Sequence, residues 1–201
     1  LPQVMHLFQQ KFPSVEIEVG NSADLSEELE NKKYHLIISG AVSAGELHAS
    51  VPLFQDQLVC IMKDDHPLSA CYFVQLDDFR RNNLISHAEK RKNRFYQQVL
   101  KPKGIEPKRI MNVGAPQAII EMVAAGFGIS IFPRWAIAEA LKTWPIICRP
   151  IGPRGLPLTW HAVYLKHANI PIYQQEFLRN ISKLNITEQS LPIGRQASAR
   201  G

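Results

Sequence analysis

The chain has 201 residues, of which 45% are hydrophobic, and it carries a formal net charge of +5. This length and composition allow an ordinary buried core and fit one large or two small globular lobes. No apolar run approaches the length of a membrane span, and the first dozen residues alternate apolar and polar side chains at helical spacing, unlike a signal peptide. We therefore expect a protein of the cytoplasm with no membrane contact.

The cysteines and histidines show no pattern typical of a metal site or a disulfide framework. Cys60, Cys71 and Cys148 are odd in number and never form a CxxC pair. The seven histidines have no HExxH or comparable spacing. The sequence also lacks a nucleophile elbow and a phosphate loop, so we expect no metal, no cofactor and no catalytic residues. An enzyme that uses His87 or a cysteine is the weakest alternative.

A short basic cluster raises the alternative of a nucleic-acid surface. Lys90, Arg91, Lys92 and Arg94 lie together at a loop-to-helix junction. No aromatic platform or glycine-rich RNA motif lies beside them, and the chain has no complete helix-turn-helix. The cluster therefore favours a solvated face over a nucleic-acid site.

The first forty residues predict a helix, a strand, a second helix and a second strand. Residues 15–19 alternate apolar and acidic side chains as a half-buried strand does, and residues 35–39 return as a strand. Asn21 or Ser22 can cap the helix between these strands, which completes a βαβ unit. Because ligands gather at the carboxyl ends of parallel strands, Asn21 and Ser22 form a candidate binding loop. Plain helix capping is the other role open to them.

The rest of the chain continues the alternation of strands and helices. Strands are expected at 58–62, 84–86, 110–113, 129–132, 145–149 and 160–165. Helices are expected at 74–79, around Phe95 and Val99, from Pro116, at 135–141 and from Pro171 to Leu184. After Leu184 the side chains turn polar and small, which predicts a mobile tail.

Residues 114–135 give the most specific local signal. Pro116 suits the first position of a helix, two glycines end that helix, and a short β-leaning run follows. Gly114 and Ala115 offer no side-chain oxygen to the first turn, so the amides near Gln117 must find water or a ligand. An uncapped helix N-terminus favours anions, which makes this turn a candidate carboxylate site. A hydrated surface loop is the other interpretation.

Four segments of the chain resemble the effector-binding region of LysR-type transcriptional regulators. They are LPQVMHLFQQKFPSVEIEV, KKYHLIIS, LFQDQLVCIMKDDHPLS and MVAAGFGISIFPRW, of which the last two are the most specific. The resemblance covers nearly the whole chain. It implies an α/β fold with two Rossmann-like lobes joined by crossover strands, similar to type 2 periplasmic binding proteins. Lobe one is expected at 1–57 and 159–188, lobe two at 58–158, and the mobile tail at 189–201.

Within this family, the segments LISHAEKRKNRFYQQVLKPKGIEP and NVGAPQAIIEMVAAGFGISIFPRWAI most resemble the homocysteine-responsive regulators of methionine biosynthesis. The resemblance implies a small effector, an amino acid or another small organic acid, in the cleft between the lobes. By position, the cleft residues that it implies are Asn21, Ser22, Ser86, His87, Gly114, Ala115, Pro116 and Gln117. His87 can pair with an amino-acid effector near neutral pH, or serve a structural role at the end of a strand.

The resemblance also implies what this chain does in a whole protein. It is expected to be a sensing and dimerising module, in a homodimer or tetramer, that reaches DNA only through a winged helix-turn-helix absent from this sequence. The family's first strand is expected to precede Leu1. A transport-linked solute-binding protein of the same fold is the alternative, and the sequence upstream of Leu1 distinguishes the two.

Overall fold

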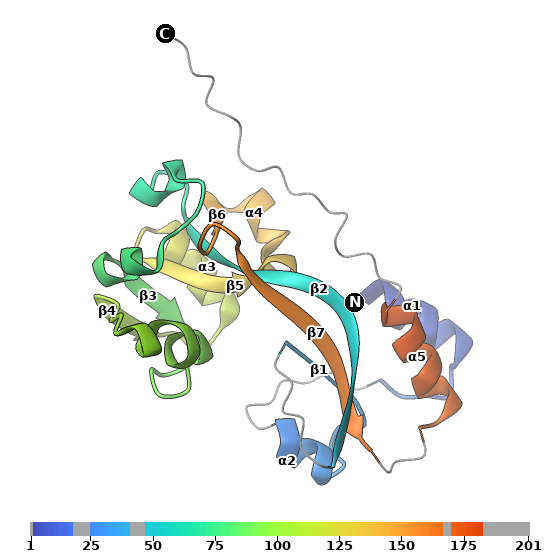
Figure 1. Ribbon diagram of the computed structural model, residues 1–201. Coiled ribbons are helices and arrows are strands. Elements are labelled where there is room, and N and C mark those ends of the chain that lie inside the picture. The colour runs from blue at the N-terminus through green and yellow to red at the C-terminus, as the bar shows by residue number, and fades with distance from the viewer. Residues whose placement is uncertain (1, 18–24, 41–46, 167–169, 183–201) are drawn as a thin grey trace. The chain divides into compact units, whose positions relative to one another are not determined.

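The computed structural model describes residues 2–17, 25–40, 47–166 and 170–182 (Figure 1). The chain divides into two compact units. Unit 1 is Leu1–Gln55 with Thr159–Gln189, and unit 2 is Asp56–Leu158 with Ser190–Gly201. Strands β2 and β7 run through both units, so the chain passes from one to the other twice. The expected tail at 189–201 lies outside the described residues.

In the described residues, seven strands form one mixed sheet in the order β1-β7-β2-β5-β3-β4, with β6 also paired to β2. Their bounds are β1 Ile37–Ser39, β2 His48–Lys63, β3 Asn83–Ser86, β4 Arg109–Asn112, β5 Ile129–Pro133, β6 Ile146–Pro150 and β7 Leu156–Leu165. Strand β3 pairs in parallel with both β4 and β5. Strand β2 pairs antiparallel with β5 and β6, and β1 pairs antiparallel with β7.

The helices are α1 Pro2–Lys11, α2 Leu25–Glu30, α3 Pro116–Ala124, α4 Ala140–Thr143 and α5 Ile172–Ser182. Shorter helical turns of 3-10 type are η1 Pro67–Ala70, η2 Leu76–Arg81, η4 Lys101–Lys103 and η5 Arg134–Ile137, and η3 Tyr96–Leu100 is π-helical. Within the described ranges, no helix has the length and apolar character needed to cross a membrane.

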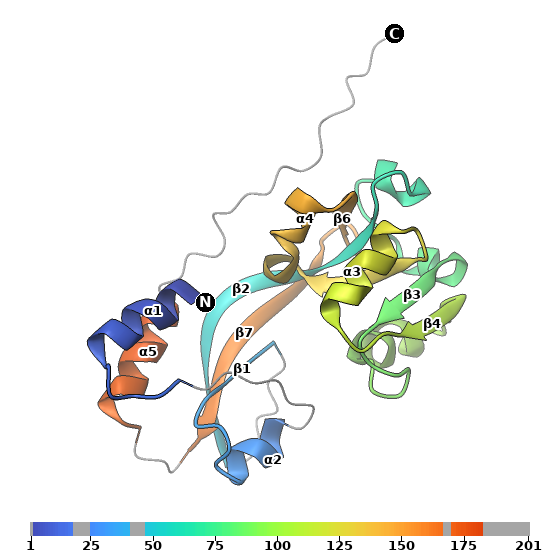
Figure 2. The ribbon, with the colours of Figure 1, turned by 180° about the vertical axis from the view of Figure 1, so that it is seen from behind.

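Unit 1 buries both faces of its strands. Helices α1 and α5 lie side by side on one face (Figures 1 and 2), where the ring centroids of Phe8 and Phe177 are 5.1 Å apart. On the other face, Leu29 of α2 packs with Ile37 of β1 and Val163 of β7. This division follows from the strand period of two, which sends neighbouring side chains to opposite faces.

One expectation for unit 1 was wrong. Residues 15–17 are not a strand, and residues 18–19 lie outside the described part of the chain. The Val15 N–H donates to the Phe12 carbonyl oxygen at 3.1 Å, and the Val15 carbonyl oxygen accepts from the Gln9 side chain at 3.0 Å. Both backbone groups of Val15 are thus bonded to α1 and the turn after it. In the described residues β1 pairs antiparallel with β7, so the expected parallel βαβ unit is not seen there.

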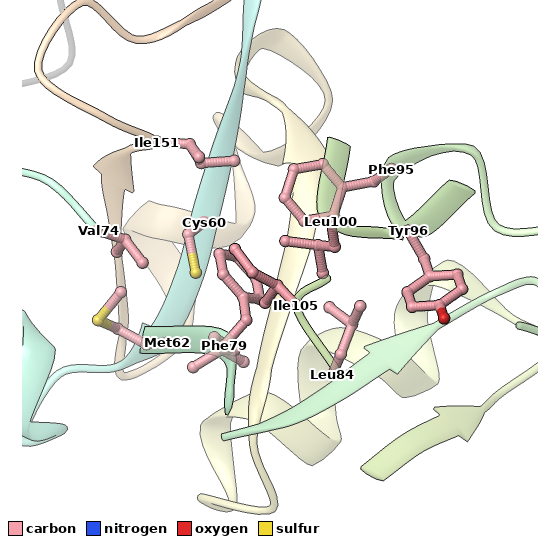
Figure 3. Close-up of a cluster of buried hydrophobic side chains, with 11 residues drawn as sticks. Cys60, Met62, Val74, Phe79, Leu84, Phe95, Tyr96, Leu100, Ile105 and Ile151 are labelled. Carbon is pink, nitrogen blue, oxygen red and sulfur yellow. The ribbon is translucent and has the colours of Figure 1, made fainter. Parts of the chain in front are cut away.

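Unit 2 has one buried cluster on each face of its sheet. The first cluster contains aromatic and aliphatic side chains from the strands and from the turns that cover them (Figure 3). The rings of Phe79 and Phe95 contact each other there, with centroids 5.2 Å apart. On the other face α3 packs against Val59, Ile61 and Ile85. Strands β2 and β3 are therefore covered on both sides, which is typical of sheets with parallel strands.

The end of α3 explains the two glycines after it. The Gly126 N–H donates to the Val123 carbonyl oxygen and the Phe127 N–H donates to the Met122 carbonyl oxygen, which together form a Schellman motif. Gly126 has a φ of +81°, the left-handed conformation that this motif requires. Gly128 is needed for another reason: a Cβ there would lie 2.5 Å from the backbone oxygen of Asn83.

A polar cluster joins the loop after β3 to the segment before β4. Glu106 accepts hydrogen bonds from the Lys90 ammonium, at 2.7 Å, and from the Tyr96 hydroxyl. The hydrogen bonds from Lys90 and then Tyr96 hold the pKa of Glu106 below its ordinary value. The same bond to Glu106 raises the pKa of Lys90.

We predict that Gly128→Ala lowers the free energy of unfolding by about 1–3 kcal/mol, because its Cβ would overlap the β3 backbone. Gly114→Ala is the matched control, since a Cβ at Gly114 meets nothing within 4 Å. The control should change stability by less than about 0.5 kcal/mol. Urea unfolding measures both. Equal stability of the two variants would contradict the close approach of β5 to β3.

We predict that Glu106→Gln destabilises the protein at neutral pH and has little effect in acid. The folded pKa of Glu106 is lowered, so its contribution is present above the unfolded pKa and is lost as the pH falls through the folded value. Urea unfolding at neutral and acidic pH gives the difference from the unsubstituted chain. Lys90→Gln should remove most of that difference at neutral pH. A difference that persists unchanged in strong acid would contradict this assignment.

Candidate functional site

The candidate site lies at one edge of the sheet in unit 2. Because β3 runs parallel to both β4 and β5, the carboxyl ends of all three strands meet there. These ends are Ser86, Asn112 and Pro133. Helix α3 begins at Pro116, shortly after β4 ends, and the Val113 N–H donates to the Ser86 carbonyl oxygen at 2.8 Å. The loops after β3 and β4 are therefore neighbours.

The first turn of α3 has no side-chain cap, as expected from the sequence. Ala115 occupies the N-cap position with extended backbone, φ −112° and ψ 132°, and Pro116 is the first helical residue. The Ile119 N–H donates a hydrogen bond to the Ala115 carbonyl oxygen, at 3.2 Å. The N–H groups of Gln117 and Ala118 precede it and point out of the helix end. Residues 114–117 are exposed, so an anion has access to these donors.

Ser86 is buried, with 7% of its surface exposed, and its hydroxyl is already engaged. It accepts hydrogen bonds from the Ala88 N–H at 3.1 Å and from the Asn93 side-chain amide at 2.8 Å. It also lies 3.0 Å from the Ala88 carbonyl oxygen, to which it donates. A hydroxyl has one donor and two acceptor sites, so these bonds use its whole capacity. In this structure Ser86 holds the loop after β3.

Asn93 was not among the residues expected from the sequence. It is buried, with 8% exposed, and besides its bond to Ser86 it accepts from the Tyr96 N–H at 2.8 Å. That second bond caps the helical turn that follows. An asparagine before a helix is a recognised capping signal, which could have identified Asn93. Its bond to Ser86 depends on the tertiary fold and leaves no local signal.

The other residues that the sequence predicts for effector binding differ in exposure and in their hydrogen bonds. His87 is exposed at the end of β3. The Gln117 side chain donates to Glu121 Oε1 at 3.1 Å, one turn further along α3. Gly114 has open space where a Cβ would lie. Asn21 and Ser22 lie outside the described residues. The structure thus places the loop that carries Ser86 and His87 beside the loop that leads into α3.

The thiols of Cys60, which is buried, and Cys148, which is partly buried, are poor candidates for catalysis. Complete burial raises the pKa of the Cys60 thiol far above its ordinary value, with a smaller contribution from Asp78. Burial also raises the pKa of Cys148. Reactive cysteines have lowered pKa values, so neither thiol is poised as a nucleophile. In the described ranges, no group of three His, Cys, Asp or Glu side chains is placed to hold a metal ion.

Comparison with known proteins identifies the fold and the family. The model of the LysR substrate binding domain matches residues 1–184. The regulator MetR of Escherichia coli K12, an HTH-type transcriptional regulator, is 25% identical over 168 residues, which are 82% of this chain and 51% of MetR. The chain spans about half the length of the curated relatives it matches first.

Two solved structures share the fold. The regulatory domain of MetR from N. meningitidis is 26% identical, with a TM-score of 0.79 over 92% of this chain and 87% of that chain. The regulatory domain of CcmR from Synechocystis PCC6803, solved in complex with 2-PG, is 20% identical, with a TM-score of 0.78 over 90% of this chain and 88% of that chain. These matches confirm the type 2 periplasmic-binding-protein-like fold. The relatives named above are transcriptional regulators and not enzymes. This chain belongs to the LysR substrate-binding domain family.

Proposed function

We propose that this chain senses a small carboxylate-bearing metabolite, which binds at the carboxyl edge of the sheet in unit 2. The observation that carries the proposal is the uncapped, exposed first turn of α3. The N–H groups of Gln117 and Ala118 would donate to one carboxylate, and the helix dipole would favour its negative charge. Gly114 and Ala115 leave the approach open because they carry almost no side chain.

The loop after β3 would supply the second part of the site. His87 is exposed beside this edge and would bond a polar group of the effector. Ser86 would contact the effector only by exchanging one of its bonds to Ala88. The family resemblance adds Asn21 and Ser22 to the proposed effector-binding residues. Both lie outside the described residues.

The finer assignment is an amino-acid effector, with homocysteine the first to test. It rests on the similarity to MetR proteins, which extends over most of this chain. The CcmR complex with 2-PG supports a small-molecule ligand for this fold in general. Homocysteine carries a carboxylate for the α3 amides and a separate amino group for a polar partner.

The whole protein would be a transcriptional regulator of the cytoplasm. The relatives named above are regulators, which favours sensing over the alternative of a transport-linked solute-binding protein. Sequence-specific DNA recognition would belong to a helix-turn-helix outside this chain. Effector binding would change the output of that domain through a coupling free energy of about 1–3 kcal/mol, the usual size for allostery.

We predict that Ala115→Asp stabilises the free protein and abolishes effector binding. The new carboxylate would cap α3 and occupy its amides, so the free energy of unfolding should rise by about 0.5–2 kcal/mol. Calorimetry against amino acids, homocysteine included, and against small organic acids should show binding to the unsubstituted chain only. Binding should also raise the melting temperature of the unsubstituted chain.

Two further substitutions at the same position control this experiment. Ala115→Asn also caps the helix but adds no charge, so it should weaken binding through loss of the amides alone. Ala115→Gly leaves the amides free and should retain binding. Undiminished affinity in Ala115→Asp would place the effector elsewhere. Binding of an organic acid but not of homocysteine would keep the carboxylate site and exclude the amino-acid assignment.

We also propose that the chain self-associates, as the family resemblance implies, and that α1 lies in the interface. Val4 and Phe8 of this helix are buried inside unit 1, whereas Leu7 is 61% exposed. The exposed Leu7 side chain offers a second copy one apolar contact on this helix.

We predict that Leu7→Lys weakens self-association at least about tenfold, because a charge would replace the apolar anchor. Lysine is a good helix former, so the melting temperature of the monomer should stay the same. Leu47→Lys is the control, since Leu47 is 52% exposed in the same unit but lies outside α1. Sedimentation equilibrium measures both variants. A clean monomer of the unsubstituted chain at tens of micromolar would rule out this interface for this chain.

A further inference from the structure

The positive charge of this chain is concentrated in one segment of unit 2. Residues 89–109 contain eight lysines and arginines against two glutamates, whereas the rest of the chain has 15 basic and 16 acidic residues. This segment therefore has a net charge of +6 and the rest of the chain −1, which together give the net charge of +5. We name its exposed cations other than Lys90 the basic face: Arg91, Lys92, Arg94, Lys101, Lys103, Lys108 and Arg109.

The fold holds the parts of this face together. The ion pair of Lys90 with Glu106, at 2.7 Å, ties the loop after β3 to the segment before β4. The Gln97 side chain donates to the Lys90 carbonyl oxygen at 2.9 Å and accepts from Lys101 Nζ at 3.1 Å. The helical turn between these segments is thus bonded to the loop. The three stretches that carry the cations lie in one region of unit 2 (Figures 1 and 2).

The cations of the basic face alternate with buried side chains and make no ion pair with a described residue. Phe95, Tyr96, Leu100 and Ile105 alternate with them in the sequence and are buried in the cluster of Figure 3. Glu106 pairs with Lys90, which is not part of the basic face, and no cation of the basic face makes an ion pair with a described residue. Any anion that neutralises these cations would come from outside the described part of the chain.

We propose that the basic face binds the phosphate backbone of double-stranded DNA without reading its sequence. A small metabolite cannot neutralise seven separate cations. Protein interfaces have an apolar core, and the large exposed hydrophobic side chains of the described residues all lie outside residues 89–109. Interfaces with DNA are more polar and strongly positive, as this face is. The contact would add to sequence-specific recognition by a separate domain, and its cations are not among the residues of the proposed effector site.

The salt dependence of DNA binding tests this proposal. Fluorescence anisotropy with a short duplex of random sequence should show weak binding by this chain, with an affinity that falls steeply as salt rises. Replacing Arg91, Lys92 and Arg94 together with glutamine should lower the slope of log affinity against log salt by up to about three, and weaken binding about tenfold or more at low salt. All three side chains are exposed, so the melting temperature should not change.

The matched control replaces Arg80, Lys142 and Arg154 with glutamine. These are exposed cations of the same unit outside the basic face, so the net charge falls by the same amount. The control should keep the slope of the unsubstituted chain. Equal losses in both triple variants, or no binding by the unsubstituted chain at low salt, would overturn the proposal. Tighter binding of poly-glutamate than of duplex, with the same dependence on the basic face, would assign an acidic protein partner in its place.

Discussion

The arrangement of unit 2 depends on β3, which is paired in parallel on both edges and covered on both faces. Leu84 and Ile85 point into the two different clusters, and the buried Ser130 hydroxyl donates to the Ile85 carbonyl oxygen at 2.7 Å. With its edges and faces filled, β3 meets solvent only at its ends. Ser86 and His87 lie at its carboxyl end, near the start of α3. The position of the candidate site therefore follows from the burial of this strand.

The two loops at this end of the sheet differ in whether their polar groups are hydrogen-bonded within the protein. The loop after β3 is closed, because Ser86 and Asn93 are buried and bonded to each other and to backbone groups. The loop after β4 is open, since Ala115 leaves the start of α3 uncapped. Buried polar groups must be hydrogen-bonded within the protein, whereas exposed ones can bond to water or to a ligand. A small anion would therefore meet fixed donors beside a loop that is held in place.

Local signals in the sequence explain which elements could be predicted. Residues 114–133 were predicted well because Pro116 and Gly126 have the backbone roles expected of them, at the start and the end of α3. Gly128 was also expected to end the helix, but the structure shows that it is needed for the close approach to the Asn83 backbone. Residues 15–17 were predicted as a strand from their alternation, but hydrogen bonds to the end of α1 override that pattern. The bond of Asn93 to Ser86 joins residues that only the folded loop brings together. Side-chain networks of this kind lie beyond any local pattern.

The uncapped start of α3 also links stability to sensing. A capping side chain at Ala115 would add about 1 kcal/mol to the stability of the helix. The fold does without it because α3 is held by its buried face, through Ile119, Ile120 and Val123. On the proposed function, a bound carboxylate supplies the missing acceptor and stabilises the folded state by mass action. The capping free energy that α3 lacks in the free protein would then be gained when the effector binds. It is similar in size to a typical allosteric coupling of about 1–3 kcal/mol.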